Sequence, residues 1–389
     1  MTKAATAVLT VFVYWGLLCA LVAQLSCAEP QGTAGDHFRR GLQLQEKGNL
    51  DGAIAEYRTS LRLNPKNPDA HYNIGLALRQ KGDPDGAIAE FRSALKLKPD
   101  DFDTHYNLGQ ALQQRGDLDG AIVEFRSALR ANSDSLDAHD DLGNVLAEKG
   151  DLDGAIAEHR AALRLNPNHA RAQYNLGIVL AQKGDLDGAI VEFRAALRAN
   201  PNYADAHDNL GNVLLEKGDL DGAIAEYHAA LQLNPDDSRT HNNLGKALDD
   251  KGDLDGAISE FRTALRLSPK YENAHYNLGN VLHRKGDLDS AITEFRATLQ
   301  LNSGDVDAHN NLGNALYDKG DREGAIAEFR MALRLNPNHA KIHFNLGRTL
   351  EAKGDLKSAL EEYRRSVELD PSNVAAKIKY SSLATRMRQ

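Results

Sequence analysis

Apolar side chains recur at helical spacing along most of this chain. Residues 205–238 illustrate the pattern, because their apolar residues fall into two groups separated at Gly218. The first group predicts a helix that ends at Lys217, since the glycine after it can take the left-handed conformation common behind helices. The second group predicts a helix that Asp219 caps and that ends near Pro235. The buried faces of the two helices are predicted to contain Ala206, Leu210, Val213, Leu214, Ala223, Ile224, Tyr227, Ala230 and Leu231.

This pair of helices repeats every 34 residues without an insertion or deletion. A fixed period indicates a stack of identical units rather than a globular domain with one centre. We number the positions of a unit from 1 to 34, starting at Ala34, and call its two helices helix A and helix B. Position 15 is glycine in all ten units: Gly48, Gly82, Gly116, Gly150, Gly184, Gly218, Gly252, Gly286, Gly320 and Gly354.

Several further positions agree at the same spacing. The chain has Gly at position 8, Leu at 11, Ala at 20, mostly Tyr or Phe at 24 and mostly Pro at 32. This pattern resembles the tetratricopeptide repeat, TPR, over residues 34–373. The resemblance implies an all-α fold, a right-handed α-solenoid of ten helix-turn-helix TPR units. Residues 374–389 fit an additional helix A with a polar outer face, which predicts a C-terminal capping helix.

The units depart from the family pattern at a few positions. Position 4 is mostly His, position 24 is His159 in one unit, and Ser133 and Ser303 replace the proline. Position 19 is Gly in eight units, which removes half of a possible capping box and costs helix B about 1 kcal/mol relative to alanine. We therefore expect helix B to fray at its start, and expect alanine at this position to raise stability.

The resemblance implies that positions 2, 5, 6, 9, 12 and 13 of helix A line a concave groove. Position 6 is asparagine in eight units, and position 9 is asparagine in four. An asparagine amide offers donors and an acceptor, as pairing with an extended peptide backbone requires. The row resembles the asparagine ladder in the TPR superhelix of O-GlcNAc transferase. Alternatively, these side chains cap or solvate neighbouring turns. The candidate peptide-binding residues are Asn73, Asn107, Asn144, Asn175, Asn209, Asn212, Asn243, Asn277, Asn280, Asn311, Asn314 and Asn345.

Acidic residues are expected on the same face. They favour neutral or basic extended segments as partners, with a salt-sensitive attraction for Lys and Arg. Positions 2 and 5 supply Asp69, Asp103, Asp137, Asp205, Asp307, Asp140 and Asp208.

Two sharper interpretations of the pattern fail. The clamp that some TPR modules use for a terminal carboxylate needs Lys at position 5, which this chain never has. Histidine recurs at position 4, but without a second ligand at metal-binding spacing it is better explained as filling a packing slot between helices A and B. These histidines are expected to make stability fall as they acquire charge below about pH 6.

Composition argues against other function classes. The chain has 46 basic and 55 acidic residues, without a basic stripe interleaved with aromatic residues, so nucleic-acid binding is not expected. Both cysteines lie in residues 1–28, which leaves the repeats without a disulfide, a thiolate or a cysteine metal site. No nucleophile and base can be assembled from residues that recur in every unit, so we predict neither an enzyme nor a cofactor. O-GlcNAc transferase carries its chemistry in a separate C-terminal domain, so its activity is not implied.

Residues 1–28 predict a secretory signal peptide. Lys3 precedes an apolar stretch, residues 4–23, and Ser26 and Ala28 form a small-residue cleavage site. Two alternatives remain: an uncleaved membrane anchor at residues 4–23, and a lipidated Cys27. Each interpretation predicts an extracytoplasmic location, periplasmic or secreted. Residues 29–33 are a short linker before the ten repeats of residues 34–373 and the cap of residues 374–389.

The sequence therefore predicts a protein-interaction scaffold that binds extended polypeptide segments through the asparagine ladder, and cell-envelope assembly is its expected setting. The alternative is a structural array that associates with itself through its convex faces or ends. The membrane is expected to be contacted only through the N-terminal segment.

Overall fold

The computed structural model describes residues 32–388, and these residues form an all-α fold. The predicted signal peptide, residues 1–28, lies outside the described residues, as do residues 29–31 of the linker. Helix A of each repeat is, in chain order, α2 (Ala34–Glu46), α4 (Pro68–Gln80), α6 (Phe102–Arg115), α8 (Leu136–Glu148), α10 (Ala170–Gln182), α12 (Ala204–Glu216), α14 (Ser238–Lys251), α16 (Glu272–Lys285), α18 (Val306–Lys319) and α20 (Ala340–Lys353).

Helix B follows each helix A after a turn at Gly and Asp or Asn. The B helices are α3 (Leu50–Leu63), α5 (Pro84–Leu97), α7 (Leu118–Ala131), α9 (Leu152–Leu165), α11 (Leu186–Ala199), α13 (Leu220–Leu233), α15 (Leu254–Leu267), α17 (Leu288–Leu301), α19 (Arg322–Leu335) and α21 (Leu356–Leu369). The last helix is α22 (Val374–Arg386).

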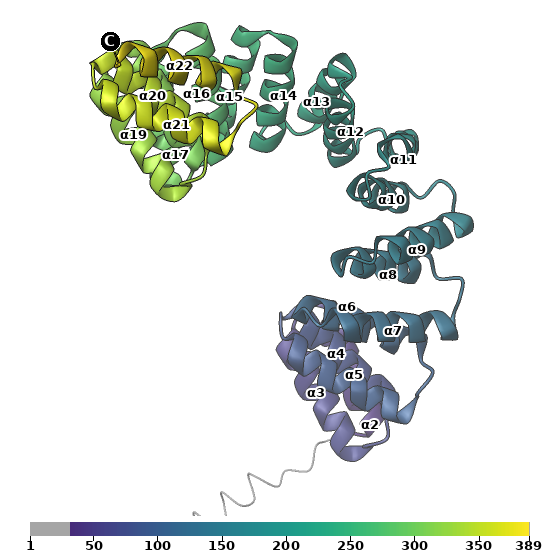
Figure 1. Ribbon diagram of the computed structural model, residues 1–389. Helices are drawn as coiled ribbons and strands as arrows, with labels where there is room; N and C mark the ends of the chain where they lie inside the picture. Colours follow the sequence, from purple (N-terminus) through teal and green to yellow (C-terminus); the bar gives the residue numbers. More distant parts are fainter. Residues whose placement is uncertain (1–31, 389) are drawn as a thin grey trace, which may run out of the picture. The chain divides into compact units, whose positions relative to one another are not determined.

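The helices form two compact units, which divide between Pro167 and Asn168. The first holds α2–α9 and the second α10–α22. Within each unit, helix A packs against its own helix B and helix B packs against the next helix A (Figure 1). The predicted fold class, an all-α solenoid of helix pairs, is confirmed.

The turn between helices A and B needs glycine at position 15. All ten of these glycines have positive φ, from 75° at Gly48 to 94° at Gly320 and Gly354. A side chain there would meet no neighbouring atom within 4 Å, so the backbone conformation rather than space explains the glycine. The prediction that this residue ends helix A is confirmed.

Glycine at position 8 has a different role, because it lies against the aromatic ring at position 24. A Cβ atom on Gly211 would lie 2.7 Å from Cε1 of Tyr227. Tyr227 is fully buried, as are Phe125 and Phe295 at the same position of other repeats. The missing side chain thus lets the ring reach the backbone of helix A, and this contact forms the centre of each repeat.

Glycine at position 19 does not leave helix B uncapped. The N–H of Gly222 donates to Oδ1 of Asp219 at 3.0 Å, and the equivalent bond occurs at each helix B of the described chain. A Cβ atom on Gly222 would lie 2.5 Å from Oδ2 of the same aspartate. The expected gain from alanine ignored this carboxylate, so that expectation needs correction.

We now expect Gly222→Ala to change the free energy of unfolding by less than about 0.5 kcal/mol. Alanine has a more favourable helix propensity than glycine by about 1 kcal/mol. This gain is offset because the new side chain displaces the Asp219 cap, whose hydrogen bond contributes a similar amount to stability. In an Asp219→Ala background, where the cap is already absent, the same substitution should stabilise by about 1 kcal/mol. Urea unfolding of the four proteins measures both values. A full gain in the wild-type background would show that the cap does not oppose the new side chain.

The C-terminal helix α22 covers one side of α21. It buries Ala376 and Leu383 and leaves Val374 and Ile378 exposed. Across residues 32–388, no helix combines the length and the apolar character that crossing a membrane requires.

Candidate functional site

Six of the asparagines at position 6 connect their helix A to the preceding one. Nδ2 of Asn277 donates to Oδ1 of Asn242 at 3.0 Å, and Nδ2 of Asn209 donates to the Tyr174 hydroxyl at 2.8 Å. In both cases position 6 of one repeat bonds to position 5 of the repeat before it. We call each such bond a rung. The other asparagine rungs join Asn107 to Tyr72, Asn243 to Asp208, Asn311 to Tyr276 and Asn345 to Asn310.

One rung runs in the opposite direction. Position 6 of the fourth repeat is Asp141, whose carboxylate can only accept, and the Tyr106 hydroxyl donates to its Oδ2 at 2.7 Å. The geometry is therefore kept while donor and acceptor exchange. Burial raises the pKa of the Tyr174 hydroxyl to about 12, so this phenol stays protonated at neutral pH and accepts from Asn209 as a neutral group.

Four predicted residues occupy position 9 beside the rungs. Oδ1 of Asn212 accepts from the Tyr227 hydroxyl and from Asn243, at 2.8 and 3.1 Å, and Oδ1 of Asn280 accepts from Asn311 at 2.9 Å. Asn144 and Asn314 are partly buried at the same position. These four residues therefore share the helix-A surface with the rungs.

The remaining predicted residues differ in their surroundings. Asn73 donates only within its own helix, to the Asp69 carbonyl at 2.8 Å. Asn175 is partly buried on α10. Exposure falls to 8% at Asn107 and 6% at Asn345. None of the twelve candidate residues is fully exposed in the described structure.

The rungs use the amide nitrogens as donors and leave most of the amide oxygens available as acceptors. Within the described residues, no hydrogen bond reaches Oδ1 of Asn107, Asn209, Asn243, Asn277 or Asn345. A rung fixes the orientation of the side chain, so each oxygen is held in a set direction. The predicted ladder of donors and acceptors is thus, at these positions, mainly a ladder of acceptors.

The prediction that Asp140 and Asp208 line the groove is wrong. Asp140 is completely buried and Asp208 is 5% exposed. Position 5 faces helix B, as the ring contact between Tyr72 and Phe91 shows, with centroids 5.9 Å apart. Burial raises the pKa of the Asp208 carboxyl, against hydrogen bonds from Thr240 and Asn243. The five position 2 aspartates, Asp69, Asp103, Asp137, Asp205 and Asp307, are exposed as expected.

The sequence analysis missed a glutamine-lined hollow of about 670 Å³ in the first unit. Its walls come from α2, α4, α6 and α8 at positions 6, 9, 12 and 13. Arg79 donates to Gln110, whose Nε2 donates to Asp141 at 3.0 Å. Glutamine at these positions in the first three repeats was the available signal. The lining residues are Gln45, Leu76, Arg79, Gln80, Gln110, Gln113, Gln114 and Asp141.

The histidines at position 4 lie between helices A and B, as expected, and each also contacts a glutamate of helix B. Nδ1 of His105 lies 2.6 Å from Oε2 of Glu124, nineteen residues further along, and the same pair forms in all nine repeats that have the histidine. In seven of them Nε2 also meets a backbone carbonyl, as His105 meets Pro99 at 2.7 Å.

For His105 and His343 the expected pH response is wrong in sign. The hydrogen bond to Glu124 raises the pKa of His105. The pKa of His343 is also raised, because bonds to Glu362 and the Pro337 carbonyl outweigh its burial. Among residues 32–388, no group of three or more His, Cys, Asp or Glu is arranged to hold a metal ion.

Comparison with protein families matches nearly the whole repeat region. Models described as "Tetratricopeptide repeat" match residues 38–102, 141–204, 310–374, 78–144 and 192–225, and one described as "TPR repeat" matches residues 211–252, 247–286 and 279–320. No curated protein sequence matches the chain.

Solved structures with helix repeats are similar to parts or most of the chain. YrrB, described as a TPR protein with an unusual peptide-binding site, is 26% identical, with a TM-score of 0.43 over 47% of this chain and 95% of that one. PilF from Pseudomonas aeruginosa is 25% identical, with a TM-score of 0.47 over 53% and 94%. The Cut9–Hcn1 structure is 18% identical, with a TM-score of 0.50 over 98% and 82%, a likeness of fold alone.

Proposed function

Because this chain belongs to the tetratricopeptide-repeat family, we propose that its helix-A surface binds extended segments of other proteins. Membership in this family supports a protein-interaction scaffold in general, and such proteins are typically not catalytic. The proposal that this chain is not an enzyme rests on that general property.

The observation that carries the proposal is the row of oriented amide oxygens. In the second unit Asn209, Asn243 and Asn277 stand on three consecutive A helices, each with its nitrogen bonded to the previous repeat. Their oxygens can accept N–H groups from a peptide backbone, whatever its side chains. An orientation fixed in advance lowers the entropic cost of binding.

A preference for neutral or basic segments follows from the same chemistry. Amide oxygens accept from lysine and arginine as well as from backbone N–H groups. The exposed carboxylates at position 2, among them Asp69 and Asp103, add an attraction that salt weakens. Because Asp140 and Asp208 are buried, this charge preference depends on fewer groups than the sequence suggested.

We expect the triple variant Asn209→Ala, Asn243→Ala and Asn277→Ala to bind a partner segment at least about ten-fold more weakly than the wild type does. Each lost hydrogen bond contributes about 0.5–1.5 kcal/mol. The partner is first enriched on the wild-type array from an envelope extract, and calorimetry then gives the affinity of its binding segment for both proteins. Circular dichroism shows whether the variant is folded.

The rungs themselves need a matched control, since the triple variant also removes bonds between repeats. Tyr174→Phe with Tyr276→Phe deletes two rung acceptors and keeps every position 6 amide. This control should bind more tightly than the triple variant does, because it keeps the amide oxygens and loses only part of their fixed orientation. Equal affinity in the folded triple variant would reject the ladder as a binding site and favour a purely structural array.

We further propose that the scaffold works outside the cytoplasm, in assembly of the cell envelope. The support is the N-terminal sequence, with Lys3, the apolar residues 4–23 and the small residues Ser26 and Ala28. The intact mass of the native protein is expected to match a chain that begins at Glu29. A membrane-bound chain that keeps Met1 would instead indicate an anchor, and an acyl mass on Cys27 a lipoprotein.

A further inference from the structure

The B helices of the first unit carry a row of exposed cations. Each has two basic residues one turn apart, at positions 25 and 29, and all eight are exposed. None of them forms an ion pair among the described residues of this unit. We call this the arginine row: Arg58, Arg62, Arg92, Lys96, Arg126, Arg130, Arg160 and Arg164.

The nearby carboxylates are bound elsewhere, which explains why the row is unpaired. Glu90 at position 23 turns inward to His71, 2.7 Å away. Asp119 at position 18 pairs with Lys149 of the next repeat, as Asp85 does with Arg115. Like charges repeated along one face repel each other, so an anionic surface that meets the row relieves this repulsion.

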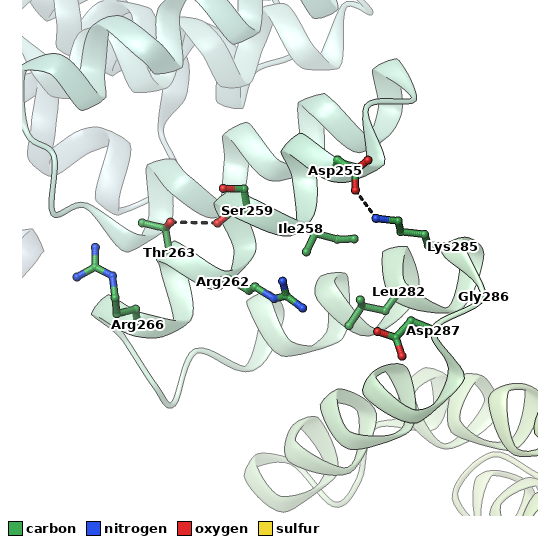
Figure 2. Close-up of a pocket in the computed structure, with 10 residues that line it drawn as sticks. All are labelled: Asp255, Ile258, Ser259, Arg262, Thr263, Arg266, Leu282, Lys285, Gly286 and Asp287. Atoms are coloured by element: carbon green, nitrogen blue, oxygen red, sulfur yellow. Dashed lines mark hydrogen bonds and ion pairs between the residues drawn. The ribbon is translucent and has the colours of Figure 1, made fainter.

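Hollows lie beside basic residues at positions 25 and 29 in both units. In the second unit a hollow of about 690 Å³ lies between α15 and the turn at Gly286. Figure 2 shows Arg262 within it, while Lys285 is joined to Asp255 at one end. A hollow of about 370 Å³ in the first unit includes Ser127 and Arg130, which occupy positions 26 and 29. Both hollows give an incoming side chain access to the cations.

An acidic row with the same period lies on the A helices of the first unit. Asp69, Asp103 and Asp137 are exposed at position 2 of consecutive repeats. Both rows recur once per 34-residue repeat, so each copy of this chain presents the exposed cations and the exposed carboxylates that a contact between copies needs.

We propose that the arginine row of one copy of this chain docks on the acidic row of a second copy. The contact joins two different faces, so it leaves a free row on each partner and can continue from copy to copy. Exposed ion pairs contribute little individually and are screened by salt, so the association is weak and depends on ionic strength. It does not require the asparagine ladder, and it stands whether or not that ladder binds peptides.

Sedimentation velocity of the repeat-containing chain tests this. The wild type is expected to sediment faster at about 20 mM salt than at about 500 mM, where screening separates the copies. Arg92→Glu with Arg126→Glu should abolish the faster species, and so should Asp69→Lys with Asp103→Lys. An equimolar mixture of these two variants should restore a pair, because their rows again carry opposite charges.

A variant with the same change in net charge distinguishes the effect of the two rows from the effect of net charge alone. Lys66→Glu with Lys270→Glu changes the net charge as the arginine variant does, at exposed sites outside both rows. It should associate as the wild type does, and circular dichroism confirms folding of every variant. A wild type that is monomeric at both salts, or a mixture that does not pair, overturns the proposal. Binding of polyglutamate by a monomeric wild type would assign the row to an acidic partner instead.

Discussion

Replacing His159 with leucine is expected to lower the free energy of unfolding by about 1–3 kcal/mol, because it removes a hydrogen-bond partner of the buried Asp140 carboxyl group. Both side chains are 0% exposed, and Nδ1 of His159 lies 2.9 Å from Oδ1 of Asp140. Nε2 of His159 is buried without a hydrogen bond in the described structure. His159 therefore contributes one hydrogen bond to Asp140 through Nδ1, while its other ring nitrogen has none in the described structure.

The neighbouring repeats supply the matched controls. Phe125→Leu makes an apolar change at the same position 24, so the excess loss in His159→Leu measures the lost hydrogen bond to Asp140. Asp140→Tyr with His159→Phe installs the ring pair that Tyr106 and Phe125 form, with centroids 5.8 Å apart. Replacing a buried ion pair by packed apolar groups is expected to stabilise by about 1–4 kcal/mol. Urea unfolding fitted with a nearest-neighbour scheme suits a repeat array. Equal losses in the two leucine variants would contradict this account.

Lowering the pH from about 9 to about 6.5 is expected to raise the free energy of unfolding. The pKa of His105 and of His343 is raised in the folded chain. A raised pKa gives stability that is complete below the ordinary histidine value and is lost as the pH rises through the folded value. The nearby charges of Arg130 and Arg365 lower the pKa of His105 and of His343, respectively, but the net shift of each pKa is upward.

The fifth repeat provides the control residue, because it has Gln173 where the others have histidine. His105→Gln with His343→Gln should flatten the dependence of the unfolding midpoint on pH between about 6.5 and about 9. The measurement stays above the range in which carboxylates with a lowered pKa, such as Asp101 and Asp117, become protonated. An unchanged slope, or a wild type that loses stability toward pH 6.5, would contradict the assignment.

The helix pairs could be predicted because their signals are local and repeated. Gly218 and Asp219 specify the end of one helix and the start of the next through backbone conformation and a single hydrogen bond. Neither depends on distant residues, and ten copies exclude coincidence. The all-α class and the helix order followed directly.

The side-chain partners could not be predicted as easily, since they depend on how the helices cross. Glu occupies position 23 in every repeat, yet only the packing of helix B on helix A brings Glu124 to His105. The rung from Asn277 to Asn242 likewise joins residues 35 apart. A burial signal was available for Asp140, because most other repeats have an aromatic or amide residue at position 5. The resemblance to the family implied a groove position for that residue instead.

Hydrogen–deuterium exchange of the array, with and without a bound partner segment, tests the central claim most directly. Salt of about 500 mM suppresses contacts between copies. The account predicts slower exchange in α12, α14 and α16, the A helices that carry Asn209, Asn243 and Asn277, and unchanged exchange in α13, α15 and α17. Protection confined to these B helices, or absent from the A helices, would contradict binding at the asparagine ladder.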